Sequence, residues 1–181
     1  RKAHVSVRIN PDIDAHTHKY VTTGLYENKF GISQHEFEKL IEIIGKSGHI
    51  NFIGLHFHIG SQITRVDEVF ALECRRVNEI VAYFERNGLK INNINLGGGL
   101  GVDYDDPDGS PIADFGTWFR TISENIVRRP DQKVHVEPGR SLVAQCATLI
   151  SRVLFVKSGE TKNFLIMDAG MNDLIRPALY G

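Results

Sequence analysis

Strand-like and helix-like patterns alternate along this chain at a nearly constant interval. Stretches typical of strands begin at residues 3, 50, 91 and 133, one start every 41 to 47 residues. Between them, apolar residues recur with helical periodicity, which favours a parallel sheet covered by helices, an α/β fold. The predicted strands are 3–9, 50–57, 91–96 and 133–137, and the predicted helices are 36–46, 67–86 and 115–126.

The ends of the predicted helices carry start and stop signals. Ser33, followed three residues later by Glu36, predicts a capping box at the start of the first helix. Gly48 and Gly88 stand where a glycine commonly follows the last helical turn. Pro130 is expected to end the third helix, because proline cannot continue the hydrogen-bond pattern.

The regular alternation ends after Arg140. Residues 142–156 and 163–167 predict two strands joined by a turn, with no helix between them. We therefore expect two domains: residues 1–141 form part of a β/α barrel, and residues 142–181 open a β domain. The chain begins directly on a strand pattern and stops after an apolar stretch, so we expect it to be part of a longer protein.

Composition excludes several classes of partner. Lys and Arg number 21 against 22 Asp and Glu, so no basic surface is expected to attract nucleic acid or anionic lipid. Apolar runs fall short of the roughly 20 residues of a membrane helix, and the first residues do not resemble a signal peptide. With two cysteines, the sequence favours a reducing compartment, and we expect a cytoplasmic protein.

Polar and glycine-rich segments follow each predicted strand at its carboxyl end. In β/α barrels the loops at this end of the strands converge and carry the active site. Four separate segments of this kind are difficult to explain by core packing alone. They are residues 10–11, 56–62, 97–101 and 137–140.

The glycine run at residues 97–99 predicts a backbone nest for an anion. Successive amides without side chains can surround a phosphate, although a tight turn is the usual reason for such a run. No helix opens directly after it, so a dinucleotide-binding fingerprint is not indicated. Ser61 and Arg140 are candidates for further phosphate or carboxylate contacts.

Two pairs of histidines attract attention. We expect His56 and His58 to face opposite sides of their strand, with His58 facing a ligand and His56 satisfied in the structure. His16 and His18 form a second pair in a long loop, and together the pairs allow a metal-dependent hydrolase as an alternative. No HExxH motif or strand-end aspartate completes a metal site, so we predict none.

Glu137 lies at a strand end and is followed by Pro138, Gly139 and Arg140. A structural ion pair between the carboxylate and the guanidinium is the simplest interpretation. Beside a phosphate nest, however, such a carboxylate also suits a cofactor with a protonatable ring nitrogen.

Together these segments resemble the diaminopimelate decarboxylases, a family of fold-type III pyridoxal-phosphate enzymes. Residues 58–62, 97–101 and 137–140 match motifs that are also found in ornithine and other basic amino-acid decarboxylases. Residues 168–180 and the loop 16–32 resemble the diaminopimelate decarboxylases themselves. The resemblance implies the C-terminal half of an alanine-racemase-like (β/α)8 barrel, followed by the first strands of a β domain.

The resemblance also implies roles for individual residues. Glu137 would pair with the pyridine nitrogen of pyridoxal 5'-phosphate, and His58 would stack on its ring. The substrate would be meso-2,6-diaminopimelate, converted to L-lysine and CO2 by a homodimer with shared active sites. The expected phosphate-binding residues are Ser61, Gly97, Gly98, Gly99, Gly139 and Arg140, and Pro138 is expected to be among the cofactor-binding residues. The expected substrate-binding residues are Arg140, Arg176 and Tyr180.

Two features of the family are not found among these 181 residues. No lysine occupies the motif of the Schiff-base lysine, and the Cys-Glu segment that contributes to catalysis is not present. Cys74 and Cys146 are expected to be packing residues. We therefore assign no catalytic residue to the chain, and expect it to be inactive alone. A decarboxylase of ornithine or lysine, and a non-catalytic remnant of such an enzyme, remain alternatives.

Overall fold

The computed structural model describes residues 1–13, 30–110 and 112–180. The chain divides into two compact units, one ending at Cys146 and the other beginning at Ala147. The first unit contains a four-stranded parallel sheet with the strand order β1-β2-β3-β4. The strands are β1 (Ala3–Arg8), β2 (Ile50–His56), β3 (Asn93–Asn95) and β4 (Lys133–His135). The predicted parallel α/β arrangement is confirmed.

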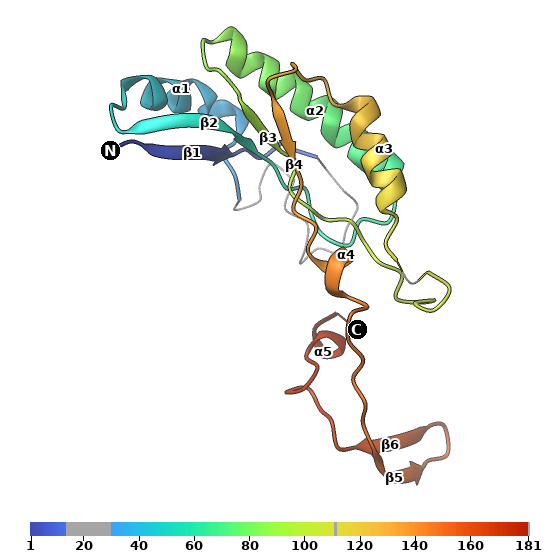
Figure 1. Cartoon of the computed structure of the whole chain (residues 1–181). Coiled ribbons are helices and arrows are strands. Elements are labelled where there is room, and N and C mark those ends of the chain that lie inside the picture. The colour runs from blue at the N-terminus through green and yellow to red at the C-terminus, as the bar shows by residue number, and fades with distance from the viewer. Residues whose placement is uncertain (14–29, 111, 181) are drawn as a thin grey trace. The chain divides into compact units, whose positions relative to one another are not determined.

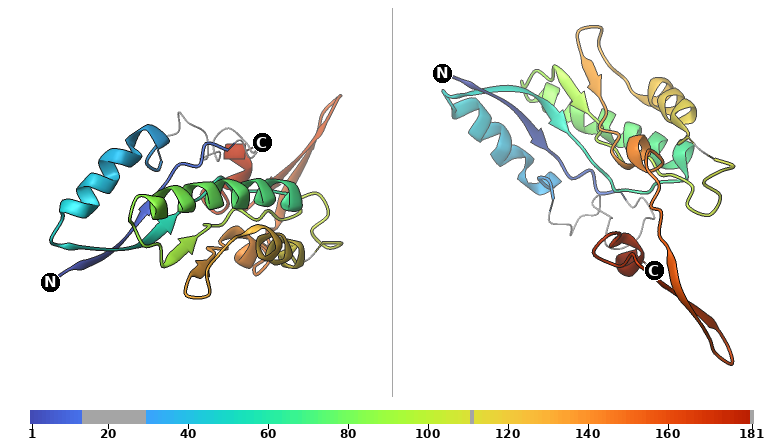
Figure 2. Two further views of the ribbon diagram at one scale, coloured as in Figure 1. Left: turned by 90° about the horizontal axis from the view of Figure 1, so that it is seen from above. Right: turned by 60° about the horizontal axis from the view of Figure 1, so that its bottom comes forward.

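Three helices lie along one side of this sheet (Figures 1 and 2). A 3-10 turn, η1 (Gln34–Glu36), leads into α1 (Phe37–Lys46), and α2 (Val66–Arg86) and α3 (Phe115–Asn125) follow β2 and β3. Aromatic rings join neighbouring helices. The ring centroids of Phe37 and Phe84 are 4.9 Å apart, and those of Phe70 and Trp118 are 5.5 Å apart. The helices thus bury most of the apolar stripes that their periodicity predicted, although Phe119 on α3 is 49% exposed.

The two faces of the sheet differ in character. Leu55 and Ile94 on the strands, and Phe57 and Leu96 directly after them, are buried in the apolar core. The alternate positions are polar at the carboxyl ends of the strands, and the last residues of the four strands stand in register across the sheet. Pairing runs from Arg8 to His56, from His56 to Asn95, and from Asn95 to His135. A continuous polar row therefore crosses the sheet at its carboxyl end.

The local signals for helix ends were partly wrong. Ser33 precedes η1 but its side chain makes no capping hydrogen bond, so the predicted capping box is not formed. Gly48 does not adopt a positive φ, whereas Gly88 does, at +85°, and ends α2 as expected. The third helix ends at Asn125, several residues before Pro130, because the chain turns to an extended conformation at Ile126.

The segment after Arg140 also differs from its prediction. A single helical turn, α4 (Arg140–Val143), follows β4, and no regular strand is found until β5 (Val153–Ser158). The predicted strand over 142–156 is therefore wrong in its first part. An apolar run by itself does not distinguish a strand from a helical turn, and here the turn after Gly139 is closed by a bond from the Leu142 amide.

The second unit contains an antiparallel hairpin of β5 and β6 (Asn163–Met167), as the sequence predicted. A tight turn joins the strands, closed by a hydrogen bond from the Gly159 amide to the Lys162 carbonyl. The hairpin is followed by a short helix, α5 (Arg176–Tyr180), which the sequence did not predict. Across the described parts of the chain, none of the helices is long and apolar enough to cross a membrane.

Candidate active site

The loops that follow β2, β3 and β4 press closely against one another. A Cβ added to Gly98 would overlap the carbonyl oxygen of Glu137, and one added to Gly99 would overlap that of Gly60. Gly97 and Gly99 also have positive φ values of 70° and 105°, which favour glycine. The glycine run is therefore required, at least in part, by the close approach of the neighbouring backbones.

Two of the three glycine amides are already engaged by side chains. Gly97 N–H donates to Oδ1 of Asn95 over 2.8 Å, and Gly98 N–H donates to Nδ1 of His58 over 3.2 Å. The Gly99 amide makes no hydrogen bond within the part of the chain that the structure describes. The same is true there of the amides of Gly139 and Arg140. The donors that remain for a bound anion thus come from two loops rather than from the glycine run alone.

Glu137 is held over the ends of β2 and β3. Its Oε1 accepts a hydrogen bond from Nδ2 of Asn95 over 2.7 Å. Its Oε2 lies 3.6 Å from Nε2 of His56. The carboxylate is therefore anchored on one oxygen and faces an imidazole with the other, which is not the ion pair with Arg140 considered from the sequence.

His56 and His58 do not face opposite sides, and this expectation was wrong because side chains two positions apart on a strand share a face. Both rings lie close enough to Glu137 for its charge to act on them. Burial lowers the pKa of each histidine, and the positive charge of Arg8 lowers both further, while Glu137 raises them. Both imidazoles are consequently biased toward the neutral form.

Gln62 joins three segments of the site, a role that its place in a motif did not reveal. Its side-chain amide donates to the Val102 carbonyl over 2.5 Å, and its Oε1 accepts from the Val102 amide over 3.3 Å. Nη1 of Arg140 also donates to that oxygen, over 3.2 Å. Gln62 has a φ of +63°, a strained conformation for a residue with a side chain. The guanidinium of Arg140 also lies 5.8 Å from the ring centre of Tyr104.

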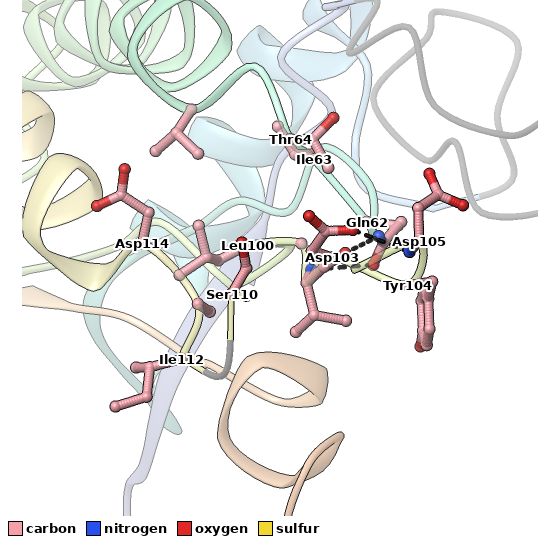
Figure 3. A pocket seen from close by; sticks show the side chains of 14 residues that line it. Gln62, Ile63, Thr64, Leu100, Asp103, Tyr104, Asp105, Ser110, Ile112 and Asp114 are labelled. Carbon is pink, nitrogen blue, oxygen red and sulfur yellow. Dashed lines mark hydrogen bonds between the residues drawn. The ribbon is translucent and has the colours of Figure 1, made fainter. Parts of the chain in front are cut away.

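A cavity of about 510 Å³ lies beside the site, between the loop after β2 and the loop 100–114 (Figure 3). It is lined by Gln62 and Gly101 but not by His58 or Glu137. One carboxylate of its lining stabilises the loop itself, because Asp103 accepts hydrogen bonds from the backbone amides of Asp105 and Asp106. These hydrogen bonds lower the pKa of Asp103. The cavity therefore borders the strand-end site and is distinct from it.

The metal alternative depends in part on residues outside the described ranges. His16 and His18 fall in the segment 14–29, as do Lys19, Tyr20 and Lys29 of the same loop. Among the residues that the structure does describe, no group of three or more His, Cys, Asp or Glu side chains is arranged to hold a metal ion. Cys74 is buried in α2, and Cys146 is exposed rather than packed, contrary to expectation.

The match to a known protein family ends two residues before the end of the first unit. The pyridoxal binding domain of the pyridoxal-dependent decarboxylases matches residues 1–144. The chain belongs to the pyridoxal-dependent decarboxylase family. The strand-end motifs from which the resemblance was inferred all lie within the matched residues, so this part of the sequence interpretation is confirmed.

Relatives within this family are named diaminopimelate decarboxylases. The one from Bacteroides thetaiotaomicron is 51% identical over 178 residues, which cover 98% of this chain and 46% of the relative. The one from Pseudomonas aeruginosa is 46% identical over 179 residues, which cover 99% of this chain and 42% of the relative. The chain therefore spans less than half the length of these relatives.

Solved structures agree with the fold. The diaminopimelate decarboxylase of Helicobacter pylori, crystallised with L-lysine, superimposes with a TM-score of 0.87 at 38% identity. The superposition covers 99% of this chain and 44% of that one. The enzyme from M. jannaschii, also in complex with L-lysine, gives a TM-score of 0.80 at 34% identity, with 99% and 42% covered. The predicted fold class, a partial β/α barrel of a pyridoxal-phosphate enzyme with the start of a β domain, is confirmed.

The side chains and amides of the site suit the cofactor of this family. A phosphate requires several donors, and three backbone amides, at Gly99, Gly139 and Arg140, are not used within the described fold. The hydroxyl of Ser61 makes no hydrogen bond with the described residues, and Oγ of Ser141 is buried without one. A basic ring nitrogen requires an anionic partner, and the Glu137 carboxylate is 55% exposed. The residues present therefore fit a phosphorylated pyridine.

The predicted substrate residues Arg176 and Tyr180 belong to the second unit. Both lie in α5, four positions apart in the sequence. Upstream of this helix, Oδ1 of Asp168 accepts hydrogen bonds from the Ser151 hydroxyl and the Arg152 amide. Another bond, from the Gly170 amide to Asp173, closes the loop that leads toward α5. The beginning of the stretch 168–180 is thus held by hydrogen bonds to its own acidic residues, Asp168 and Asp173.

Proposed function

We propose that this chain supplies the cofactor-holding part of a decarboxylase that converts meso-2,6-diaminopimelate to L-lysine and CO2. The observation that carries the proposal is the position of Glu137, an exposed carboxylate anchored by Asn95 beside the glycine loop and His58. Because the family binds pyridoxal phosphate, this carboxylate can serve as the anionic partner of the pyridine nitrogen. A pyridine ring that is kept protonated by such a partner is a good electron acceptor. The high identity to named diaminopimelate decarboxylases supports the choice of substrate.

The phosphate end of the cofactor is assigned to two loops and a serine. The amides of Gly99, Gly139 and Arg140 are the donors that the fold leaves unused, and Ser61 adds a hydroxyl. Gly97 and Gly98 serve this end indirectly, since their lack of side chains lets the loops approach. Pro138 fixes the turn between Glu137 and the phosphate donors.

The ring end of the cofactor is assigned to Glu137 and His58. When bound, pyridoxal phosphate supplies a protonated ring that accepts the electron pair released as CO2 leaves. Glu137 holds the proton at the ring nitrogen, since an adjacent negative charge favours the protonated form. The neutral imidazole of His58 would cover one face of the bound ring and exclude water from it.

The far end of the substrate carries a carboxylate and an amine that distinguish diaminopimelate from lysine. We assign its recognition to Arg140, Arg176 and Tyr180. A guanidinium can bind a carboxylate through two parallel hydrogen bonds, which a lysine ammonium cannot do. Loss of these contacts is expected to weaken selection against lysine and ornithine more than it weakens cofactor binding.

The test is an exchange of segments between close relatives. This sequence replaces the matching segment of the Bacteroides thetaiotaomicron relative, and CO2 release is measured from meso-diaminopimelate, L-lysine and L-ornithine. We expect turnover of meso-diaminopimelate alone. Turnover only of lysine or ornithine would contradict the substrate assignment, and turnover of none of them by a folded chimera that binds cofactor would contradict the proposed activity.

Two variants of the chimera test the assigned ring contact. Glu137→Gln removes the negative charge at the ring nitrogen and is expected to lower kcat by about 100-fold or more. Glu38→Gln is the matched control, because Glu38 is an exposed glutamate on α1. Equal activity of the two variants would contradict the role of Glu137.

The assembly and the compartment are also proposed. We infer a cytoplasmic homodimer with shared active sites, because the resemblance to the diaminopimelate decarboxylases implies this assembly. Sedimentation of the chimera at several concentrations tests the dimer, and mixing two differently inactivated chimeras tests the sharing of sites. Restored activity in the mixture supports shared sites, and its absence in mixed dimers would contradict them.

A further inference from the structure

Asn95 connects two functional elements of the site with one side chain. It is the last residue of β3, where it stands in register between His56 on β2 and His135 on β4. Its Oδ1 accepts from the Gly97 amide over 2.8 Å, and its Nδ2 donates to Oε1 of Glu137 over 2.7 Å. Both ends of the amide are thus in use, one on the glycine loop and one on the carboxylate.

These two bonds determine the orientation of the Asn95 amide. An amide oxygen cannot donate to a carboxylate, and an amide nitrogen cannot accept from a backbone N–H, so the reverse orientation would break both bonds. The backbone reinforces the arrangement, because the Glu137 amide donates to the Gly97 carbonyl over 2.5 Å. Glu137 and the glycine loop are therefore joined twice, once through the main chain and once through Asn95.

The other contacts of the carboxylate cannot replace this bond. Oε2 lies 3.6 Å from Nε2 of His56, beyond the range of a strong hydrogen bond. Burial lowers the pKa of His56, so its ring is biased toward the neutral form and gives little charge attraction. With 55% of the Glu137 side chain exposed, the carboxylate would have several rotamers available without Asn95.

We propose that Asn95 is a positioning residue, which fixes the Glu137 carboxylate relative to the glycine loop and thereby orients it toward the ring nitrogen of the cofactor. This inference depends on the proposed function only for the statement that the group facing Glu137 is the pyridine ring of the cofactor. No pattern in the sequence indicates this positioning role, because Asn95 and Glu137 are 42 positions apart and Asn95 is a single polar residue on a short strand.

The first test requires no cofactor. The ring of His56 is titrated by NMR in the full 181-residue chain and in the variants Asn95→Ala, Asn95→Leu and Glu137→Gln. The Leu variant keeps the side-chain volume if the Ala variant fails to fold. Because Glu137 raises the pKa of His56, its removal in Glu137→Gln should lower that pKa. Both Asn95 variants should show part of the same downward shift, since the carboxylate leaves its place.

Asn93→Ala is the matched control on the same strand and the same face. Asn93 pairs with His135 over 2.9 Å and with the Ile53 carbonyl over 3.0 Å, and neither bond involves Glu137. This variant should leave the titration of His56 unchanged. An unchanged His56 titration in both Asn95 variants, with a shift in Glu137→Gln, would overturn the positioning role.

The second test uses 4'-deoxypyridoxine 5'-phosphate, which cannot bond covalently to a lysine, labelled with 15N in its ring. Bound to the wild-type chain, the ring nitrogen should keep its proton to a higher pH than it does in free solution. Glu137→Gln should remove this effect. The Asn95 variants should lower the pH at which the ring nitrogen loses its proton by about one unit. Asn93→Ala should not change it.

The two tests separate failure of the inference from failure of the proposed function. If Glu137→Gln changes the pKa of the bound ring nitrogen and the Asn95 variants do not, the positioning role is overturned and the cofactor assignment stands. If neither Glu137→Gln nor the Asn95 variants change the pKa of the ring nitrogen, the role of Glu137 toward the cofactor is overturned. The His56 titration then still decides whether Asn95 positions the carboxylate.

Discussion

The backbone amide of Gly98 donates a hydrogen bond to Nδ1 of His58 over 3.2 Å. Because Nδ1 accepts this bond, the neutral ring carries its proton on Nε2, and its plane is fixed relative to the glycine loop. Protonation of Nδ1 would break the bond. The same glycine run therefore orients both side chains assigned to the cofactor ring, His58 directly and Glu137 through Asn95.

We expect the free energy of unfolding to decrease as the pH falls below about 6.5, the usual pKa of histidine. Burial lowers the pKa of His58 and of His56 in the folded chain, so the unfolded chain binds more protons in this range. The loss is complete once the pH is below the folded-state values. His58→Gln should reduce this dependence, measured by urea denaturation between about pH 5 and pH 8.

His49→Gln serves as the control for this experiment, because His49 is exposed and outside the site. It should leave the pH dependence as in the wild type. A His58→Gln chain with the full wild-type dependence would show that the ring of His58 is not held in its neutral form by the fold.

Gly98→Ala should destabilise the chain by about 3 kcal/mol, because the added methyl group overlaps the Glu137 carbonyl oxygen and forces two loops apart. Gly45→Ala should instead stabilise it by about 0.5–1 kcal/mol, since Gly45 lies within α1 with open space around it. Denaturant unfolding of both variants measures the difference. Equal effects of the two substitutions would contradict the close approach of the loops.

Glu73 is fully buried in α2, and neither of its carboxylate oxygens has a hydrogen-bond partner among the described residues. Burial raises its pKa well above the ordinary value, so the stability present at acidic pH is lost as the pH rises toward the folded-state pKa. Glu73→Met should therefore be more stable than the wild type by about 1–4 kcal/mol at alkaline pH, with a smaller gain at acidic pH. Glu38→Met, at an exposed position of α1, should show no such pH dependence.

The 181-residue chain alone should release no measurable CO2 from meso-diaminopimelate with added pyridoxal phosphate. None of its lysines lies in the motif that the family joins to the cofactor, and the Cys-Glu segment is not among its residues. Gas release is measured beside the active chimera at equal concentration. Turnover by the chain near that of the chimera would contradict both the roles assigned above and the need for residues that it does not contain.

The sheet and the meeting of the strand-end motifs could be predicted from the sequence for one physical reason. Parallel strands have their carboxyl ends at the same edge of the sheet, so motifs that follow successive strands must meet there. The contacts of Glu137 confirm this meeting for the loops after β2, β3 and β4. Neither the length of the strands nor their end residues could be predicted as well, because ladder hydrogen bonds depend on the partner strand.

The errors have equally specific causes. His56 and His58 were expected on opposite faces, although residues two positions apart on a strand share one. The apolar run from Leu142 was interpreted as a strand, and its first residues form the turn α4 instead. Asn95 lies in no motif, and Gln62 lies in one that did not indicate its contacts, since the partners of both residues come from segments about 40 positions away.

The polar row of Arg8, His56, Asn95 and His135 depends on chain length as much as on residue type. Loss of Asn93 or Ile94 from β3 would move Asn95 back by one position and turn it toward the helices, and Leu96 would take its place at the end of the strand. A substitution changes one residue of the row, whereas such a deletion moves every later side chain of the strand to the opposite face of the sheet. Natural variation in length should therefore collect in the exposed loop 103–110 and be absent from the strands that carry the row.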